Sequence, residues 1–161
     1  MNEHGYVKSV HRHIPSHIYR WKINDNYAGG VPDAFYCDIG GMLFVEYKYI
    51  PKVPKRGTTY IVPSLSELQK LWLAGRENQN VAVIVVLGTP LGSIVFSSNR
   101  TWERGITRDE LDLYALPAKE VARIIVDHCI GKSHVSRNEQ IYPDTKRPQQ
   151  SPPAQEALDA A

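Results

Sequence analysis

The sequence predicts an α/β protein built on a mixed β-sheet. Segments with a helical spacing of apolar residues alternate along the chain with short runs rich in β-branched and aromatic residues. Residues 81–87 form a continuous apolar run, which is typical of a strand buried on both faces of an α/β sheet. The resulting order, which is a helix, three strands, a helix, a strand and a later helix, supports this class.

The first half of the chain is expected to supply one helix, a loop and three strands. Their ranges are helix 2–13, strand 17–22, loop 24–30, and the strands 33–37 and 42–50. Asn2 is a suitable N-cap for the helix, and Pro15 follows its end. Gly40-Gly41 is a turn signal between the last two strands, which we therefore expect to pair as an antiparallel hairpin.

The second half is expected to add two helices, two strands, a helical turn and a basic loop. These are loop 50–63, a helix from Ser64, strand 81–87, an edge strand at 93–97, a helical turn at 109–114, and a helix from Pro117 to Gly131. Ser64-x-x-Glu67 has the capping-box pattern of a helix start. We expect that helix to bury one apolar face, made of Leu65, Leu68, Leu71 and Trp72.

Two carboxylates and a lysine stand at the ends of the predicted hairpin. Asp33 follows Val31-Pro32 at the start of one strand, and Glu46-Tyr47-Lys48 lies near the end of the other. Side chains two residues apart in a strand share a face, so Glu46 and Lys48 project together while Tyr47 points the other way. Since the start of one antiparallel strand lies beside the end of its partner, Asp33 and Glu46 can converge.

These residue types suit the hydrolysis of a phosphodiester. That reaction needs a hard cation to neutralise charge on the scissile phosphate and to make a usable nucleophile from water. Mg²⁺ takes oxygen ligands, usually one or two carboxylates with waters and substrate phosphate, and Asp33 and Glu46 can supply them. Lys48 can place a positive charge beside the water or the phosphate. The pattern therefore indicates a metal-dependent nuclease, and the alternative is that these charged residues are merely solvated at strand ends.

The same motifs resemble those of the PD-(D/E)XK nuclease superfamily, and within it the virus-type replication-repair nuclease group (VRR-NUC). The resemblance covers about residues 1–90 and rests on Glu3, Gly30-Val31-Pro32-Asp33, Glu46-Tyr47-Lys48 and Gln69. It implies a restriction-endonuclease-like core, in which helices flank the mixed β-sheet. It also implies Mg²⁺ or Mn²⁺ as the cofactor, held by Asp33, Glu46 and the backbone carbonyl of Tyr47, with Lys48 in a catalytic role.

The resemblance places two further residues at the site. It implies that Gln69 supports catalysis from the helix packed beside the metal, and that an acidic residue of the first helix, Glu3, completes the set of catalytic or metal-binding groups. Each residue also has a plainer interpretation. Gln69 would otherwise be an ordinary exposed helix residue, and Glu3 a favourable charge in the first turn of a helix.

The distribution of charge favours a nucleic-acid partner more than the net charge of +2 does. Residues 1–60 carry eight Lys or Arg against five Asp or Glu, which would present a basic face to phosphates. The candidate nucleic-acid-binding residues are Lys22, Lys52, Lys55 and Arg56. One or two of the N-terminal histidines are candidates for phosphate contact. Trp21 and Tyr27 could stack on bases, although aromatic residues beside a strand more often belong to the core.

Length and composition indicate one ordinary globular domain. The 161 residues are 42% hydrophobic and 22% charged. No apolar run reaches the length of a membrane span, and no signal-peptide core is present, so we expect a cytoplasmic protein without a membrane partner. We expect the nuclease domain to cover residues 1–135 and a disordered, proline-rich tail to cover 136–161. Cys37 and Cys129 are expected to be buried as small hydrophobic residues.

We therefore expect a Mg²⁺- or Mn²⁺-dependent DNA endonuclease. The small size leaves little room for a sequence-reading domain, which favours recognition of DNA structure, such as junctions, flaps or ends, in replication, repair or recombination. A phage or mobile element would suit this activity, and a homodimer acting on branched DNA is expected by analogy alone. Two alternatives stay open: a catalytically inactive DNA-binding module with the nuclease fold, and a sequence-specific endonuclease of the restriction type.

Overall fold

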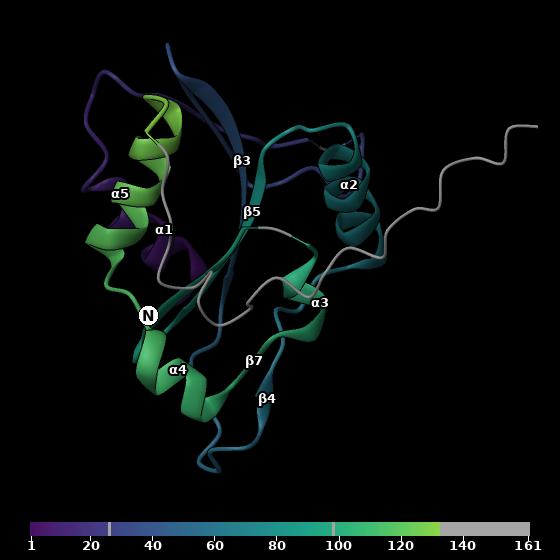
Figure 1. The fold of residues 1–161 in the computed structure, drawn as a ribbon, viewed down its shortest axis with the longest axis vertical. Helices are drawn as coiled ribbons and strands as arrows, with labels where there is room; N and C mark the ends of the chain where they lie inside the picture. The colour runs from purple at the N-terminus through teal and green to yellow at the C-terminus, as the bar shows by residue number, and fades with distance from the viewer. Residues whose placement is uncertain (26, 98, 133–161) are drawn as a thin grey trace, which may run out of the picture.

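The computed structural model describes residues 1–25, 27–97 and 99–132 (Figure 1). Its helices and strands follow one another as α1 (Glu3–His11), β1 (Tyr19–Lys22), β2 (Ala34–Asp38), β3 (Gly41–Tyr49), β4 (Tyr60–Ile61), α2 (Glu67–Asn78), β5 (Val83–Thr89), β6 (Gly92–Phe96), α3 (Thr101–Arg104), β7 (Ile106–Thr107), α4 (Arg108–Tyr114) and α5 (Ala118–Cys129). The predicted domain end at residue 135 and the predicted tail over 136–161 lie outside the described residues.

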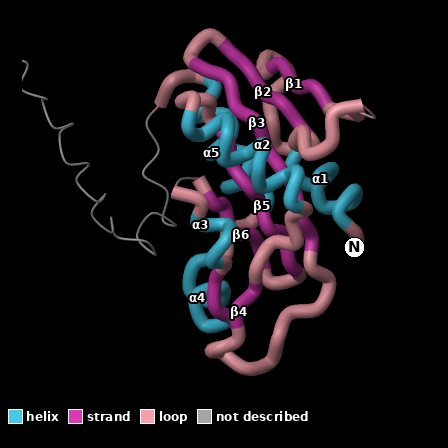
Figure 2. The backbone as a smooth tube through the Cα atoms, turned by 90° about the vertical axis from the view of Figure 1, so that its right-hand side faces the viewer, coloured by secondary structure: helices cyan, strands magenta, loops and turns pink. Residues whose placement is uncertain are grey.

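The centre of the molecule is a five-stranded sheet in the order β1-β2-β3-β5-β6. Strands β3 and β5 are parallel and the other neighbours are antiparallel, so the sheet is mixed. Strands β4 and β7 form a separate antiparallel pair, and β4 lies at the far end of the molecule from β1 and β2 (Figure 2). The predicted α/β class, a mixed sheet with flanking helices, is confirmed. Within the described part of the chain, no helix is both long enough and apolar enough to cross a membrane.

Helices cover both faces of the sheet (Figure 1). Helices α1 and α5 contact β3 from one side, and α2 contacts β5 from the other. The apolar cluster on the α1–α5 side includes Tyr47 and Ile125. The cluster on the opposite side includes Val85, Leu73 and Trp102. Strand β5 is buried along its whole length between these two clusters, which is the physical reason for its continuous apolar sequence.

Several predicted features are present where the sequence placed them. The side chain of Asn2 caps α1 by accepting a hydrogen bond from the backbone N–H of Gly5 at 2.9 Å. Strands β2 and β3 form the predicted hairpin, and β6 is at the edge of the sheet. Gly131 follows α5 with a φ of 75°, a left-handed conformation that glycine adopts without steric cost. Pro117, predicted as the first residue of that helix, is instead its N-cap.

The predicted start and buried face of α2 are wrong. The helix begins at Glu67, and its capping box joins Ser66 to Gln69. Leu68 and Leu71 are 58% and 69% exposed. The face turned to the sheet carries Gln69, Trp72, Leu73 and Arg76, which follow helical spacing. A hydrophobic pattern could not identify this face, because a polar residue, Gln69, occupies its first position.

Two predictions about side-chain burial are also corrected. Trp21 is 53% exposed and Tyr27 is fully exposed, so neither belongs to the core. Strand β1 is exposed along its whole length, which leaves its aromatic side chains in solvent. Cys129 is buried as expected, whereas Cys37 is only half-buried on β2.

Candidate active site

The β2–β3 hairpin brings the two predicted carboxylates together. Ala34 pairs with Val45, so Asp33 stands directly before the paired residues at the position opposite Glu46. Asp33 Oδ2 accepts a hydrogen bond from the backbone N–H of Tyr47 at 2.9 Å. This bond fixes the Asp33 carboxylate against the strand that carries Glu46 and Lys48. The chain therefore has two acids and a lysine at one end of the hairpin.

Glu46 is the most deeply buried charged residue of the site, with 1% of its surface exposed. Its Oε1 lies 2.7 Å from Lys48 Nζ and also accepts a hydrogen bond from Gln69 Nε2. Its Oε2 is buried and has no hydrogen-bond partner among the described residues. A buried carboxylate oxygen left without a donor is costly, so this atom is a natural ligand for a cation.

Electrostatics at the site reflect the closeness of its charges. The pKa of Glu46 is raised to about 7, mainly by burial and also by the charges of Asp33 and Glu3, while Lys48 opposes this rise. Burial alone would lower the pKa of Lys48, but its hydrogen bond and ion pair with Glu46 hold that pKa above the ordinary value. Lys48 is therefore charged at neutral pH. The raised pKa of Glu46 favours its protonated form, unless a bound cation stabilises the charged carboxylate.

Gln69 joins the start of α2 to the Glu46 carboxylate. Its Oε1 accepts from the backbone N–H of Ser66 at 2.9 Å in the capping box, while its Nε2 donates to Glu46. The loop before Asp33 packs on the same turn of the helix. Gly30 has a φ of 90°, and a Cβ there would lie 2.4 Å from the backbone oxygen of Leu68. Glycine is therefore required for the loop to approach α2 this closely.

Glu3 lies near this group but is not shown to be a ligand. It is in the first turn of α1, beside the N-cap Asn2, which is the position that its plainer interpretation predicts. Its charge raises the pKa of both Glu46 and Lys48, which places it within electrostatic reach of them. Among the described residues, no three or more His, Cys, Asp or Glu side chains group closely enough to hold a metal ion.

The donors that are present fit a hard divalent cation. Asp33 and Glu46 offer carboxylate oxygens, one of which is the unpartnered Oε2, and the backbone carbonyl of Tyr47 belongs to the residue between Glu46 and Lys48. Mg²⁺ and Mn²⁺ prefer all-oxygen sets of this kind, completed by water and substrate phosphate. Asp33, Glu46 and the Tyr47 carbonyl are therefore the groups that could hold such an ion.

A hydrogen-bonded chain supports the strand from the opposite face, and the sequence did not reveal it. The Tyr47 hydroxyl lies 2.8 Å from the Tyr36 hydroxyl, which in turn contacts His11 Nε2 on α1. Both tyrosines are fully buried. Strand alternation places residues 36 and 47 on the same face, which was the signal available in the sequence.

The predicted nucleic-acid-binding residues fall into two places. Lys22 is on β1 and lines a cavity that Asp33 also lines. Lys52, Lys55 and Arg56 are exposed in the loop between β3 and β4. The structure adds Lys8 and Arg20, which line the cavity with Lys22 and which the sequence did not single out.

Comparison with known proteins adds little to this geometry. No family model matches the chain, and no curated protein matches it. Among solved structures, one match is the 1.6 Å structure of Hjc from Archaeoglobus fulgidus, described as a Holliday junction resolvase from an archaeal hyperthermophile. It is 13% identical, covers 68% of this chain and 98% of its own, and has a TM-score of 0.38. At that level of similarity, neither the substrate of that protein nor the roles of its residues can be assigned to this chain.

Proposed function

We propose that this protein is a Mg²⁺- or Mn²⁺-dependent DNA endonuclease. The observation that carries the proposal is the arrangement around Glu46. A carboxylate with 1% of its surface exposed lies beside a second carboxylate, has Lys48 and Gln69 on one oxygen, and keeps its other oxygen without a partner. A merely solvated strand end would not bury this group, and a site that only binds phosphates would gain nothing from two acids.

Each residue has a defined task in the proposed reaction. Asp33, Glu46 and the carbonyl of Tyr47 would hold the cation, which when bound neutralises charge on the scissile phosphate and makes water a better nucleophile. Lys48 supplies a fixed positive charge that orients the attacking water and stabilises charge developing on the phosphate. Gln69 holds the Glu46 carboxylate in place from α2, and Glu3 adds negative charge that favours cation binding.

We further propose that the protein recognises DNA structure, such as junctions, flaps or ends. The described residues form one small α/β unit. The carboxylate site lies at the end of the β2–β3 hairpin, near α1 and α2. The proposal extends to membership of the VRR-NUC group, to a role in replication, repair or recombination in a phage or mobile element, and to a homodimer. It rests on the sequence motifs and not on the solved structure that matches.

The direct test is cleavage of labelled single strand, duplex, flap and four-way junction with Mg²⁺ or Mn²⁺. We expect Asp33→Ala, Glu46→Ala and Lys48→Ala each to abolish cutting while circular dichroism shows the fold intact. Asp112→Ala, which removes an exposed carboxylate on α4, is the matched control and should cut like wild type. Full activity of Asp33→Ala or Glu46→Ala would refute the site. Tight binding in EDTA without cutting under any condition would instead indicate the inactive binding module.

A further inference from the structure

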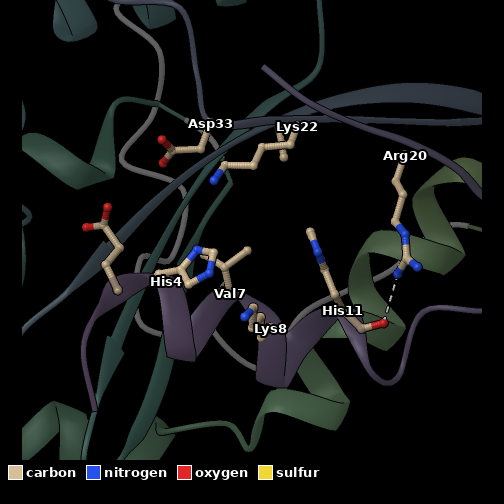
Figure 3. A pocket seen from close by; sticks show the side chains of 9 residues that line it. His4, Val7, Lys8, His11, Arg20, Lys22 and Asp33 are labelled. Carbon is tan, nitrogen blue, oxygen red and sulfur yellow. Dashed lines mark hydrogen bonds between the residues drawn. The ribbon is translucent and has the colours of Figure 1, made fainter. Parts of the chain in front are cut away.

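A cavity of about 380 Å³ lies between α1 and β1, and Asp33 is at one end of it (Figure 3). We call it the α1–β1 cavity. Its wall consists of Glu3, His4, Val7, Lys8 and His11 from α1, Arg20 and Lys22 from β1, and Asp33 and Ala34 at the start of β2. Asp33 therefore belongs both to this cavity and to the carboxylate site, so the cavity adjoins the site.

The charge of the cavity wall suits a phosphate. Lys8, Arg20 and Lys22 form no ion pair with any carboxylate in the described part of the chain, and they outnumber the two acids of the cavity wall, Glu3 and Asp33. Arg20 is fixed in place, because its Nη1 donates a hydrogen bond to the backbone oxygen of His11 at 3.0 Å. This bond leaves other guanidinium N–H groups for an acceptor.

The positive charges of the cavity wall lower the pKa of a histidine in the same wall. Burial lowers the pKa of His11, and the nearby charges of Arg20 and Lys22 lower it further. Figure 3 shows Lys22 and Asp33 at one end of the cavity and Arg20 and His11 at the other, so positive groups occur along its length. A polyanion entering from the carboxylate site would meet these cations in succession.

The size and lining of the cavity limit what can occupy it. Its volume is at the low end of the range of roughly 300–1,000 Å³ for small-ligand sites, which leaves room for one nucleotide and not for a base pair. Val7 provides an apolar surface for a sugar or a base. A nucleotide can enter such a cavity only after leaving the helical stack, and that costs least when it is unpaired.

We propose that the α1–β1 cavity binds one unpaired nucleotide of the substrate strand, next to the scissile phosphate. Lys8, Arg20 and Lys22 contact the phosphate backbone of that nucleotide, and its sugar and base lie over Val7. The inference rests on the proposed function for its location, and it deepens that function by naming the substrate class: nucleic acid with an unpaired segment beside the cleavage point. A blunt duplex has no unpaired nucleotide that could occupy the cavity.

Binding without cleavage tests the proposal. We would measure fluorescence anisotropy of a labelled blunt duplex and of the same duplex with a short single-stranded overhang, with Ca²⁺ in place of Mg²⁺ to occupy the carboxylates. The wild-type chain should prefer the overhang substrate. The double variant Lys8→Ala/Lys22→Ala should bind that substrate about tenfold or more weakly, and the slope of log affinity against log salt should fall by about 1 for each lysine. Its affinity for the blunt duplex should change far less.

Two further variants separate shape from charge. Val7→Phe fills the cavity from α1 without changing its charge, so it should weaken binding of the overhang substrate while leaving the salt slope unchanged. Lys119→Ala removes an exposed lysine on α5, outside the cavity, and should bind both substrates like wild type. Thermal unfolding would verify that each variant folds, and if Val7→Phe does not, the exposed lysines still decide the question.

The outcomes distinguish this proposal from the nuclease assignment. Unchanged affinity of the double variant for the overhang substrate would overturn the cavity proposal, as would an equal loss for both substrates, which would indicate a general electrostatic surface. Either result leaves the Glu46→Ala cleavage test untouched. Conversely, selective loss of overhang binding in a protein that never cuts would support the cavity while refuting the nuclease.

Discussion

At the scale of single residues, Glu46 determines the chemistry of the site. Burying a carboxylate is unfavourable unless its oxygens are satisfied, and only one of the Glu46 oxygens is. The metal-free protein must therefore bear a cost that a bound cation would relieve. That cost appears as a pKa raised to about 7 by burial and by the charges of Asp33 and Glu3.

The raised pKa predicts how stability depends on pH. Because folding raises the pKa of Glu46 from 4.5 to about 7, its contribution to stability is present below pH 4.5 and is lost as the pH rises through 7. Glu46→Gln cannot lose a proton, so without metal it should gain about 1–3 kcal/mol over wild type between pH 5 and pH 8. Thermal unfolding in EDTA across this range measures the difference. Parallel curves for the two proteins would contradict the prediction, and Asp112→Asn should follow wild type.

At the scale of elements, the first turn of α2 joins helix capping to the candidate active site. Gln69 is the partner of Ser66 in the capping box and also a donor to Glu46. The residue that completes the cap of this helix is therefore the same residue that holds the Glu46 carboxylate. The hairpin fixes the other half of the site, because its register places Asp33 opposite Glu46.

Two substitutions separate these roles of α2. Ser66→Ala removes the cap alone and should cost about 1 kcal/mol of stability with cleavage little changed. Gln69→Ala removes the cap partner and the donor to Glu46, so it should lose similar stability and also cut roughly 10- to 100-fold more slowly. Denaturant unfolding and single-turnover cleavage measure the two effects. Equal cleavage by both variants would show that Gln69 serves only as a helix cap.

At the scale of the whole molecule, the site lies at the end of the hairpin, next to the apolar clusters on the two faces of the sheet. Helices α1 and α2 lie on opposite faces of the sheet, and each contributes a residue within reach of Glu46. A bound cation would therefore join Asp33 to Glu46 across the hairpin, and α2 is attached to Glu46 through Gln69. Metal binding and folding stability should be coupled through this one point.

This coupling predicts stabilisation by metal. Mn²⁺ at 100 times its dissociation constant should stabilise the fold by about 2.7 kcal/mol, which corresponds to a rise of several degrees in Tm. Asp33→Asn keeps an oxygen that can accept the bond from Tyr47 N–H but removes the charge, so it should fold and show no rise. Differential scanning calorimetry with Mn²⁺ and EDTA measures both proteins. An undiminished rise in Asp33→Asn would place the metal elsewhere.

Much of the fold and of the candidate site is predictable from local patterns. Alternation in strands placed Glu46 and Lys48 on one face, and the Gly40-Gly41 turn signal predicted the hairpin that brings Asp33 beside them. The continuous apolar run identified β5 as a strand buried on both faces. These predictions succeed because backbone geometry alone constrains residues that are near one another in sequence.

Contacts between distant segments were decided only by the tertiary structure. The sequence pattern predicted a helix start at Ser64 where the structure has the cap at Ser66, and the bond from Gln69 to Glu46 is one that no local pattern contains. The same holds for the exposure of Leu68, the Tyr36–Tyr47 pair and the α1–β1 cavity. The sequence by itself determined which residues can do chemistry and which face of a strand they share. Only the packed fold determined which of them are buried and paired, because burial depends on how whole elements meet.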